Sequence, residues 1–149
     1  MHRLPSAICC LVLGTALVLT GALPAEATKA ELQGSWTAIK AERDGKGADE
    51  VVGHRLSFAG NGFQIRSTDG KSLYAGTVRV DPRAKPAAID FTHKQGVLSG
   101  KAWKGIYVLD GDTLTICDNA QNPDKGRPTA FEAKSGSGNV LITFKRAKP

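Results

Sequence analysis

Short runs of alternating apolar and polar residues fill most of the chain after residue 33, with turn residues between them. Such alternation places every second side chain on the same face of a β-strand. Asp-Gly and Asn-Gly pairs between the runs favour tight turns that need a positive φ angle. The pattern predicts a short helical turn over 28–33 and then eight strands, over 34–43, 54–58, 63–67, 73–80, 87–93, 103–109, 113–117 and 139–146.

Consecutive short strands with tight turns predict an all-β fold. Antiparallel strands must hide their edges, and an up-and-down β-barrel of about eight strands does so by closing on itself. A two-sheet β-sandwich is the alternative, because turn spacing alone does not separate the two architectures. The segment Pro128–Ala133 is left open as a short ninth strand or a lid.

The first and last predicted strands carry residues that suit the closure of a barrel. Gly34-x-Trp36 opens the first strand, and Arg146 ends the last one. Alternation puts Arg146 in phase with Ile142 and Phe144, so an inward-facing last strand would carry the arginine to Trp36. We therefore predict that Gly34, Trp36 and Arg146 form the structural closure of the barrel.

Residues 1–27 have the features of a secretory signal peptide. Arg3 supplies a positive start, residues 7–23 are uncharged and mostly apolar, and Ala25-Glu26-Ala27 has the small residues that signal peptidase needs. We expect cleavage after Ala27, which leaves 28–149 as a single periplasmic or extracellular domain without a membrane span. A retained anchor is the competing interpretation, although the apolar run is shorter than the roughly 20 residues of a spanning helix.

The cysteine content and the charge of this 149-residue chain indicate which disulfides and which kinds of partner it can have. Only Cys117 lies in 28–149, so the mature domain has no internal disulfide, and its thiol is most simply a small buried side chain. The net charge of +6 is scattered apart from the basic tail. No basic stripe with interleaved aromatic residues is present, which argues against a nucleic-acid partner. Oligomeric state is not readable from these features.

Candidate catalytic groups are sparse. Asp110 and Asp112 flank Gly111, where carboxylates usually bind turn amides, and Glu42, Arg43 and Asp44 are typical of a solvated strand end. The histidines of the mature domain lack a third metal ligand, and no glycine-rich phosphate loop leads into a helix. The sequence therefore predicts no catalytic residue, no metal, no cofactor and no enzyme activity.

Several motifs follow one another in an order that resembles a known family. They cover about residues 31–146, and they are Leu32-x-Gly34-x-Trp36, Ala41-Glu42-Arg43-Asp44-Gly45, Asp81-Pro82, Ala88-Ile89-Asp90, Gly105-Ile106-Tyr107-x-Leu109-Asp110-Gly111-Asp112-Thr113-Leu114-x-Ile116-Cys117, Arg127-Pro128-Thr129-x-Phe131 and Gly136-Ser137-Gly138. The chain resembles the uncharacterised lipocalin-like domain family abundant in planctomycete-type bacteria. That resemblance implies an exported barrel and carries no established activity.

A more distant resemblance is to the lipocalins themselves. In that pattern an arginine after the last strand packs across the tryptophan of the first strand, at the closed end of the barrel. Gly34-x-Trp36 and Arg146 match it here. The resemblance implies a cation–π contact, which contributes roughly 0.5–2 kcal/mol. The usual lipocalin disulfide has no counterpart in this chain.

Two functions remain: a barrel that binds a small apolar or amphipathic molecule, and a structural or interaction protein of the cell envelope whose barrel is filled by its own side chains. In an up-and-down barrel, His54, His93 and Trp103 share an inward phase and the end opposite Trp36. Tyr74, near the start of its strand, joins them. We predict that these four residues rim the ligand site, where an imidazole can hydrogen-bond a polar head group.

Overall fold

The structure is a computed structural model that describes residues 27–148. The predicted signal peptide, except Ala27, lies outside the described residues. The helices and strands are α1 (Lys29–Leu32), β1 (Gly34–Arg43), β2 (Lys46–Gly47), η1 (Asp49–Val51), β3 (Arg55–Ala59), β4 (Gly62–Arg66), β5 (Ser72–Asp81), β6 (Ala88–His93), η2 (Gly96–Leu98), β7 (Ala102–Asp110), β8 (Thr113–Asp118) and β9 (Val140–Arg146).

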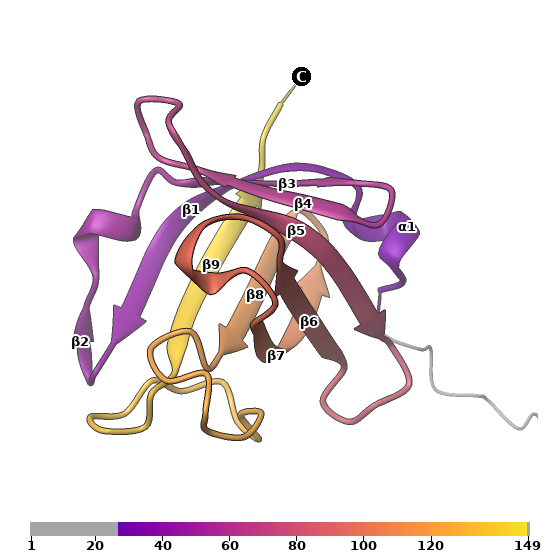
Figure 1. The fold of residues 1–149 in the computed structure, drawn as a ribbon. Coiled ribbons are helices and arrows are strands. Elements are labelled where there is room, and N and C mark those ends of the chain that lie inside the picture. Colours follow the sequence, from indigo (N-terminus) through magenta and orange to yellow (C-terminus); the bar gives the residue numbers. More distant parts are fainter. Residues whose placement is uncertain (1–26, 149) are drawn as a thin grey trace, which may run out of the picture.

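The strands form a closed antiparallel barrel (Figure 1). Each strand from β3 to β8 pairs with the next one along the chain, β1 pairs with β3, and a β1–β9 pairing closes the sheet. This confirms the predicted up-and-down barrel and excludes the sandwich. The eight predicted strands match the observed ones to within one residue at either end. The two-residue β2, which folds back onto the end of β1, was not predicted.

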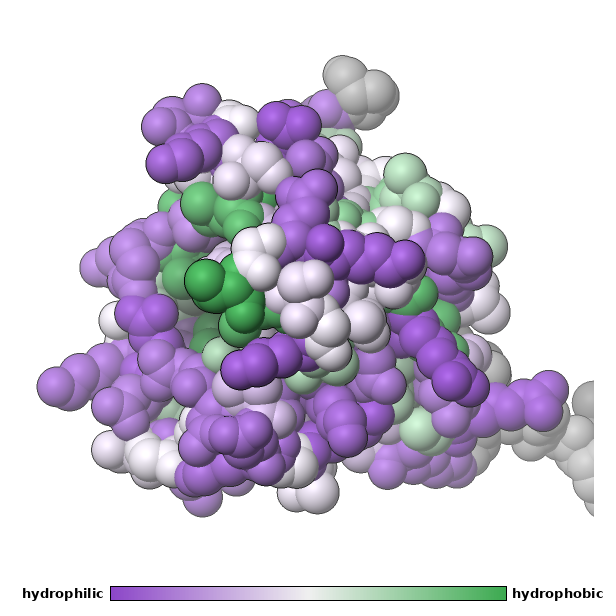
Figure 2. Space-filling view, viewed as in Figure 1, coloured by the Kyte–Doolittle hydropathy of each residue, from purple (hydrophilic) through white to green (hydrophobic). Residues whose placement is uncertain are grey.

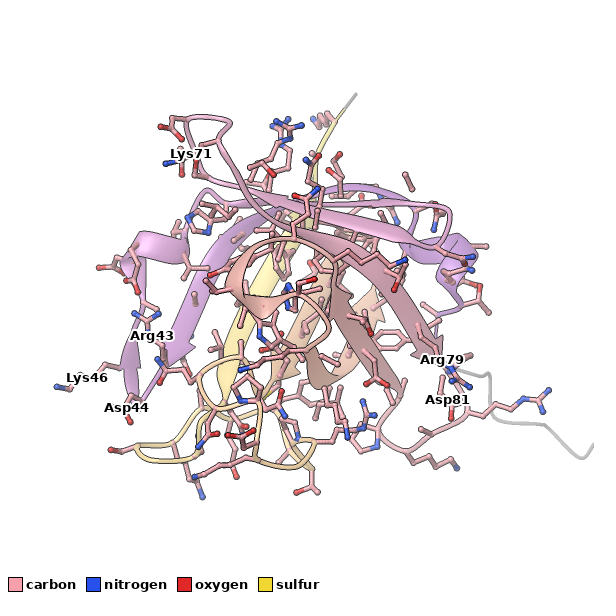
Figure 3. The ribbon with its side chains drawn as sticks, viewed as in Figure 1. Arg43, Asp44, Lys46, Lys71, Arg79 and Asp81 are labelled. Carbon is pink, nitrogen blue, oxygen red and sulfur yellow. The ribbon has the colours of Figure 1, made fainter. Side chains whose placement is uncertain are left out.

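The meander gives the barrel two different ends. At the closed end lie the starts of β1, β6 and β8 and the end of β9, because Trp36 pairs with Arg146 and Lys145 with Thr113. At the open end lie the ends of β1, β6 and β8, together with η1, η2, the β4–β5 turn and the loop 119–139 (Figure 1). In Figure 3, Arg43 and Lys71 of the open end lie on the left, and Asp81 of the closed end lies on the right.

Side chains of alternate residues fill the closed half of the barrel. Leu32, Trp36, Ile89 and Tyr107 are almost entirely buried and belong to one hydrophobic cluster with Phe58. The described chain begins at this cluster, because Ala27 is buried there and its carbonyl accepts a hydrogen bond from the Tyr107 hydroxyl. The interior of the closed half is therefore filled by the protein's own side chains.

Trp36 and Arg146 meet at the closed end. The guanidinium carbon of Arg146 lies 4.2 Å from the centroid of the Trp36 ring. Arg146 also donates to the carbonyls of Glu31 and Gln33, each at 3.0 Å, while Trp36 Nε1 donates to the carbonyl of Leu32 at 2.9 Å. The pair thus satisfies three consecutive carbonyls at the end of α1, which a helix leaves without internal partners.

Gly34 lies next to this pair, at the point where α1 leads into β1. Its φ of 108° lies in the region that residues with a Cβ rarely adopt. A Cβ built on Gly34 would lie 3.7 Å from an Arg146 guanidinium nitrogen. The three residues predicted for closure are therefore neighbours in space.

The loop 119–139 contacts the outer side of the barrel at β7 and β8. Cys117 and its register partner Ile106 are buried but lie outside the inward cluster, and the Cys117 thiol contacts the carbonyl of Glu132 at 3.5 Å. The loop is tied to the β1–β2 turn, where Asp44 Oδ1 accepts from the Gly136 N–H at 2.8 Å. Pro128–Ala133, left open as a ninth strand or a lid, is neither: it is irregular chain packed on this wall.

Candidate functional site

The open half of the barrel encloses a cavity of about 350 Å³. This lies at the lower end of the 300–1,000 Å³ that is usual for small-molecule sites. Most of its wall is apolar and comes from inward positions of β3, β4, β6, β7, β8 and β9: Leu56, Ile65, Phe91, Trp103, Ile116, Ile142 and Phe144. An apolar molecule in this space would be removed from water, which is the main source of affinity in such sites.

Three of the four residues predicted for the ligand site line this cavity. His54, which precedes β3, is half-buried at its edge, Tyr74 comes from β5, and Trp103 comes from β7. Tyr74 and Trp103 contact each other, with ring centroids 4.8 Å apart. The structure therefore brings Tyr74 and Trp103 together and places His54 on another part of the same wall.

His93, the fourth predicted residue, is not among the residues that line the cavity. It is 1 % exposed and is in phase with Ile89 and Phe91. Its ring centroid lies 4.1 Å from that of Trp103 and 5.6 Å from those of Tyr74 and Phe63. Burial lowers the pKa of the His93 ring, because it disfavours the charged form. The expectation of an imidazole at a wet mouth is wrong for this residue, because its neighbours enclose it.

Polar atoms are left without partners in this aromatic group. Neither ring nitrogen of His93 and not the Nε1 of Trp103 has a hydrogen-bond partner among the described residues. A buried donor without a partner costs about 1–3 kcal/mol. The group supporting the cavity wall is thus held by packing of ring faces and edges.

Asp118 is a cavity residue that the sequence analysis missed. It ends β8, is 7 % exposed and lines the cavity in phase with Leu114 and Ile116. Its Oδ1 accepts from the Ala120 N–H at 3.0 Å, and burial raises its pKa to about 7 against that hydrogen bond. Asp118 is in phase with the inward residue Ile116, but the predicted strand ended at residue 117, so its alternation was not followed to Asp118.

Arg43 and Glu50 form an ion pair at the edge of the cavity. Arg43 ends β1 (Figure 3) and Glu50 lies in η1. Both residues contribute to the lining of the cavity. The sequence analysis took Arg43 for a solvated strand end. The structure instead folds η1 back over it, so that the strand end becomes part of the site. Both side chains stay more than a third exposed, so the pair contributes little to stability.

Hydrophobic side chains also reach the surface at the open end. Leu73 and Tyr74 line the cavity and are each more than a third exposed, and Val97 in η2 is 96 % exposed. In the view of Figure 2, hydrophobic residues are visible on the left half of the molecule. This is the side on which Arg43 and Lys71 of the open end lie in Figure 3. The entrance to the cavity is therefore partly apolar.

The remaining candidate chemistry falls outside the cavity. Asp112 pairs with Arg146 at 3.4 Å at the closed end, and the Cys117 thiol is buried on the outer wall with its pKa raised to about 11 by burial. Within residues 27–148 no three His, Cys, Asp or Glu residues are grouped to hold a metal ion. In the same range no helix has the length and apolar character needed to cross a membrane.

Comparison with known proteins finds no family model and no curated protein that matches this chain. The lipocalin-like resemblance therefore rests on the motifs quoted above.

Proposed function

We propose that this is an exported binding protein whose barrel holds a small, mainly apolar or amphipathic molecule. The observation that carries the proposal is the cavity of about 350 Å³ in the open half, with its apolar wall and few polar residues. Apolar walls supply affinity in such sites, and the polar groups orient the ligand. The ligand enters past the exposed side chains of Leu73 and Tyr74.

The alternative is a structural or interaction protein of the envelope with a self-filled barrel. The packing of Trp36, Tyr107 and their neighbours supports that description for the closed half alone. The cavity at the other end favours the binding protein, because an interior without a ligand to hold would gain stability by filling this space.

Titration with the fluorescent probe 1-N-phenylnaphthylamine tests the binding function. We expect saturable binding that is lost when Ile65→Trp fills the cavity from β4. Ile39→Trp is the matched control, because Ile39 is half exposed and does not line the cavity. Absence of saturable binding, or equal binding by both variants, would refute a site in this cavity.

Export is tested separately by sequencing the N-terminus of the protein recovered from outside the cytoplasm. We expect residues 1–27 to be absent. Recovery of the full chain in the cytoplasm, or of a chain that keeps these residues, would contradict the signal peptide.

A further inference from the structure

We infer that the cavity selects a cationic amphiphile, with an amine or quaternary ammonium group held at Asp118 and an apolar body against the aromatic wall. This rests on the proposed binding function and names the class of its ligand. The inference starts from Asp118, which is buried, lines the cavity and takes part in none of the ion pairs among the described residues.

The fold leaves this carboxyl group short of partners. Its one side-chain hydrogen bond in the described part of the chain is from the Ala120 N–H to Oδ1. A carboxylate has about four acceptor sites on its two oxygens. The remaining acceptor capacity at the cavity therefore suits a donor or a cation brought by a ligand.

Gly105 provides the space that Asp118 occupies. The two residues are register partners on β7 and β8, and a Cβ on Gly105 would lie 2.9 Å from the Asp118 Cβ and 2.9 Å from the Cys117 carbonyl oxygen. That separation is shorter than real Cβ contacts. A glycine at an inward position of β7 thus lets the carboxyl group sit against the barrel wall.

Aromatic rings complete a site for a cation. Trp103, two residues before Gly105 on the same inward face, lines the cavity together with Phe91 and Phe144. A cation is attracted to the face of such rings, and most strongly to tryptophan. A carboxylate and aromatic rings that line one cavity supply both kinds of contact that an alkylammonium group can make.

The other charged groups around the cavity do not neutralise Asp118. Arg43 is paired with Glu50, and burial is the main cause that raises the pKa of Asp118 to about 7, with no neighbouring charge among the causes. A buried carboxyl group with a raised pKa marks a candidate functional site. The other titratable groups facing the cavity are His54 and Tyr74.

Calorimetric titration with n-octylamine, 1-octanol and octanoate tests the inference, because the three probes share one chain and differ in the head group. We expect octylamine to bind about tenfold or more tightly than either of the others, as a charge-assisted contact is roughly twice as strong as a neutral one. In Asp118→Asn this preference should disappear. Asp110→Asn, with the same change of charge at the exposed end of β7, should keep it.

The preference should also depend on pH. If only the ionised carboxylate binds the cation, the affinity for octylamine should rise roughly tenfold from pH 6 to pH 8. The amine itself stays charged in this range, since alkylamines titrate near pH 10. A pH dependence that remains unchanged in Asp118→Asn would overturn the assignment of the cation to Asp118.

The outcomes separate the inference from the proposed function. Equal or tighter binding of octanol or octanoate overturns the cationic ligand and leaves a binding protein, as does an amine preference that survives in Asp118→Asn. Binding of 1-N-phenylnaphthylamine without binding of octylamine overturns the inference alone. Failure of all four probes overturns the inference and the proposed function together.

Discussion

Replacing Trp36 and Arg146, singly and together, tests how the barrel is closed. Trp36→Leu removes the aromatic face and keeps an apolar side chain in the buried site. Arg146→Ala removes the guanidinium group and both of its hydrogen bonds to the carbonyls of Glu31 and Gln33. The double variant shows how much of the two effects is shared.

The structure sets the expected sizes. Trp36 is fully buried, and truncating a large aromatic residue in a core costs about 3–5 kcal/mol to alanine, so leucine should cost somewhat less. Arg146 is one-third exposed and its ion pair is with the largely exposed Asp112, so screening discounts that term. The cation–π contact and two hydrogen bonds together suggest about 2–3 kcal/mol for Arg146→Ala.

Only part of this is shared between the two residues. The hydrogen bonds of Arg146 go to backbone carbonyls and persist in Trp36→Leu, whereas the contact at 4.2 Å needs both side chains. We therefore expect a coupling free energy of about 1 kcal/mol.

Urea unfolding followed by far-ultraviolet circular dichroism measures all four free energies without relying on tryptophan emission. Lys145→Ala is the matched control, because Lys145 is the exposed neighbour on the same strand, and its change should stay within about 0.5 kcal/mol. A coupling below about 0.3 kcal/mol, with unchanged m-values, would refute a direct contact between the ring and the guanidinium group.

Three further predictions concern stability and reactivity. Asp118→Asn should be more stable than the parent protein at pH 8, by up to about 4 kcal/mol. The pKa of Asp118 is about 7 in the folded protein and about 3.9 in the unfolded chain, so the parent protein loses stability as the pH rises between these two values. The buried His93 has the opposite effect, because its lowered pKa makes the protein less stable as the pH falls below the pKa of His93 in the unfolded chain. This effect is the same in both proteins. Equal pH dependence of urea unfolding in the two proteins would contradict the effect of Asp118. Gly76→Ala should destabilise the protein by several kcal/mol, because the new Cβ would lie 1.9 Å from a carbonyl oxygen of β6. Gly126→Ala is the control and should be near neutral, because no atom lies within 4 Å of the new Cβ. Similar melting temperatures of the two variants would contradict the close approach of β5 and β6 at Gly76. Cys117 should react with a thiol reagent only after unfolding, because its thiol is buried with its pKa near 11; fast labelling of the folded protein would show that the outer loop opens.

Asp118 provides a polar group in the cavity but lowers the free energy of unfolding of the barrel. An isolated carboxyl group in an apolar wall costs free energy when it is ionised, and a well-packed apolar residue would remove that cost. The closed half of the barrel, where Trp36 and Tyr107 fill the interior, supplies the packing that tolerates such a group. The cavity and the Trp36–Arg146 closure thus lie at opposite ends of the same sheet.

The sequence by itself determined the strands, the order of pairing and the closure. Alternation and turn residues are local signals, so they marked each strand to within one residue, and the phase of Arg146 with Phe144 was enough to bring it to Trp36. The same signals missed β2, because a two-residue strand has no period to read.

Only the tertiary structure decided how deep each inward residue lies. His54 and His93 have the same phase, yet His54 lines the cavity while three rings enclose His93. Tertiary packing also laid Pro128–Ala133 on the outer wall and buried Asp118 inside. The physical reason is that alternation is a property of one strand, whereas burial depth and cavity shape depend on side chains from strands far apart in the sequence.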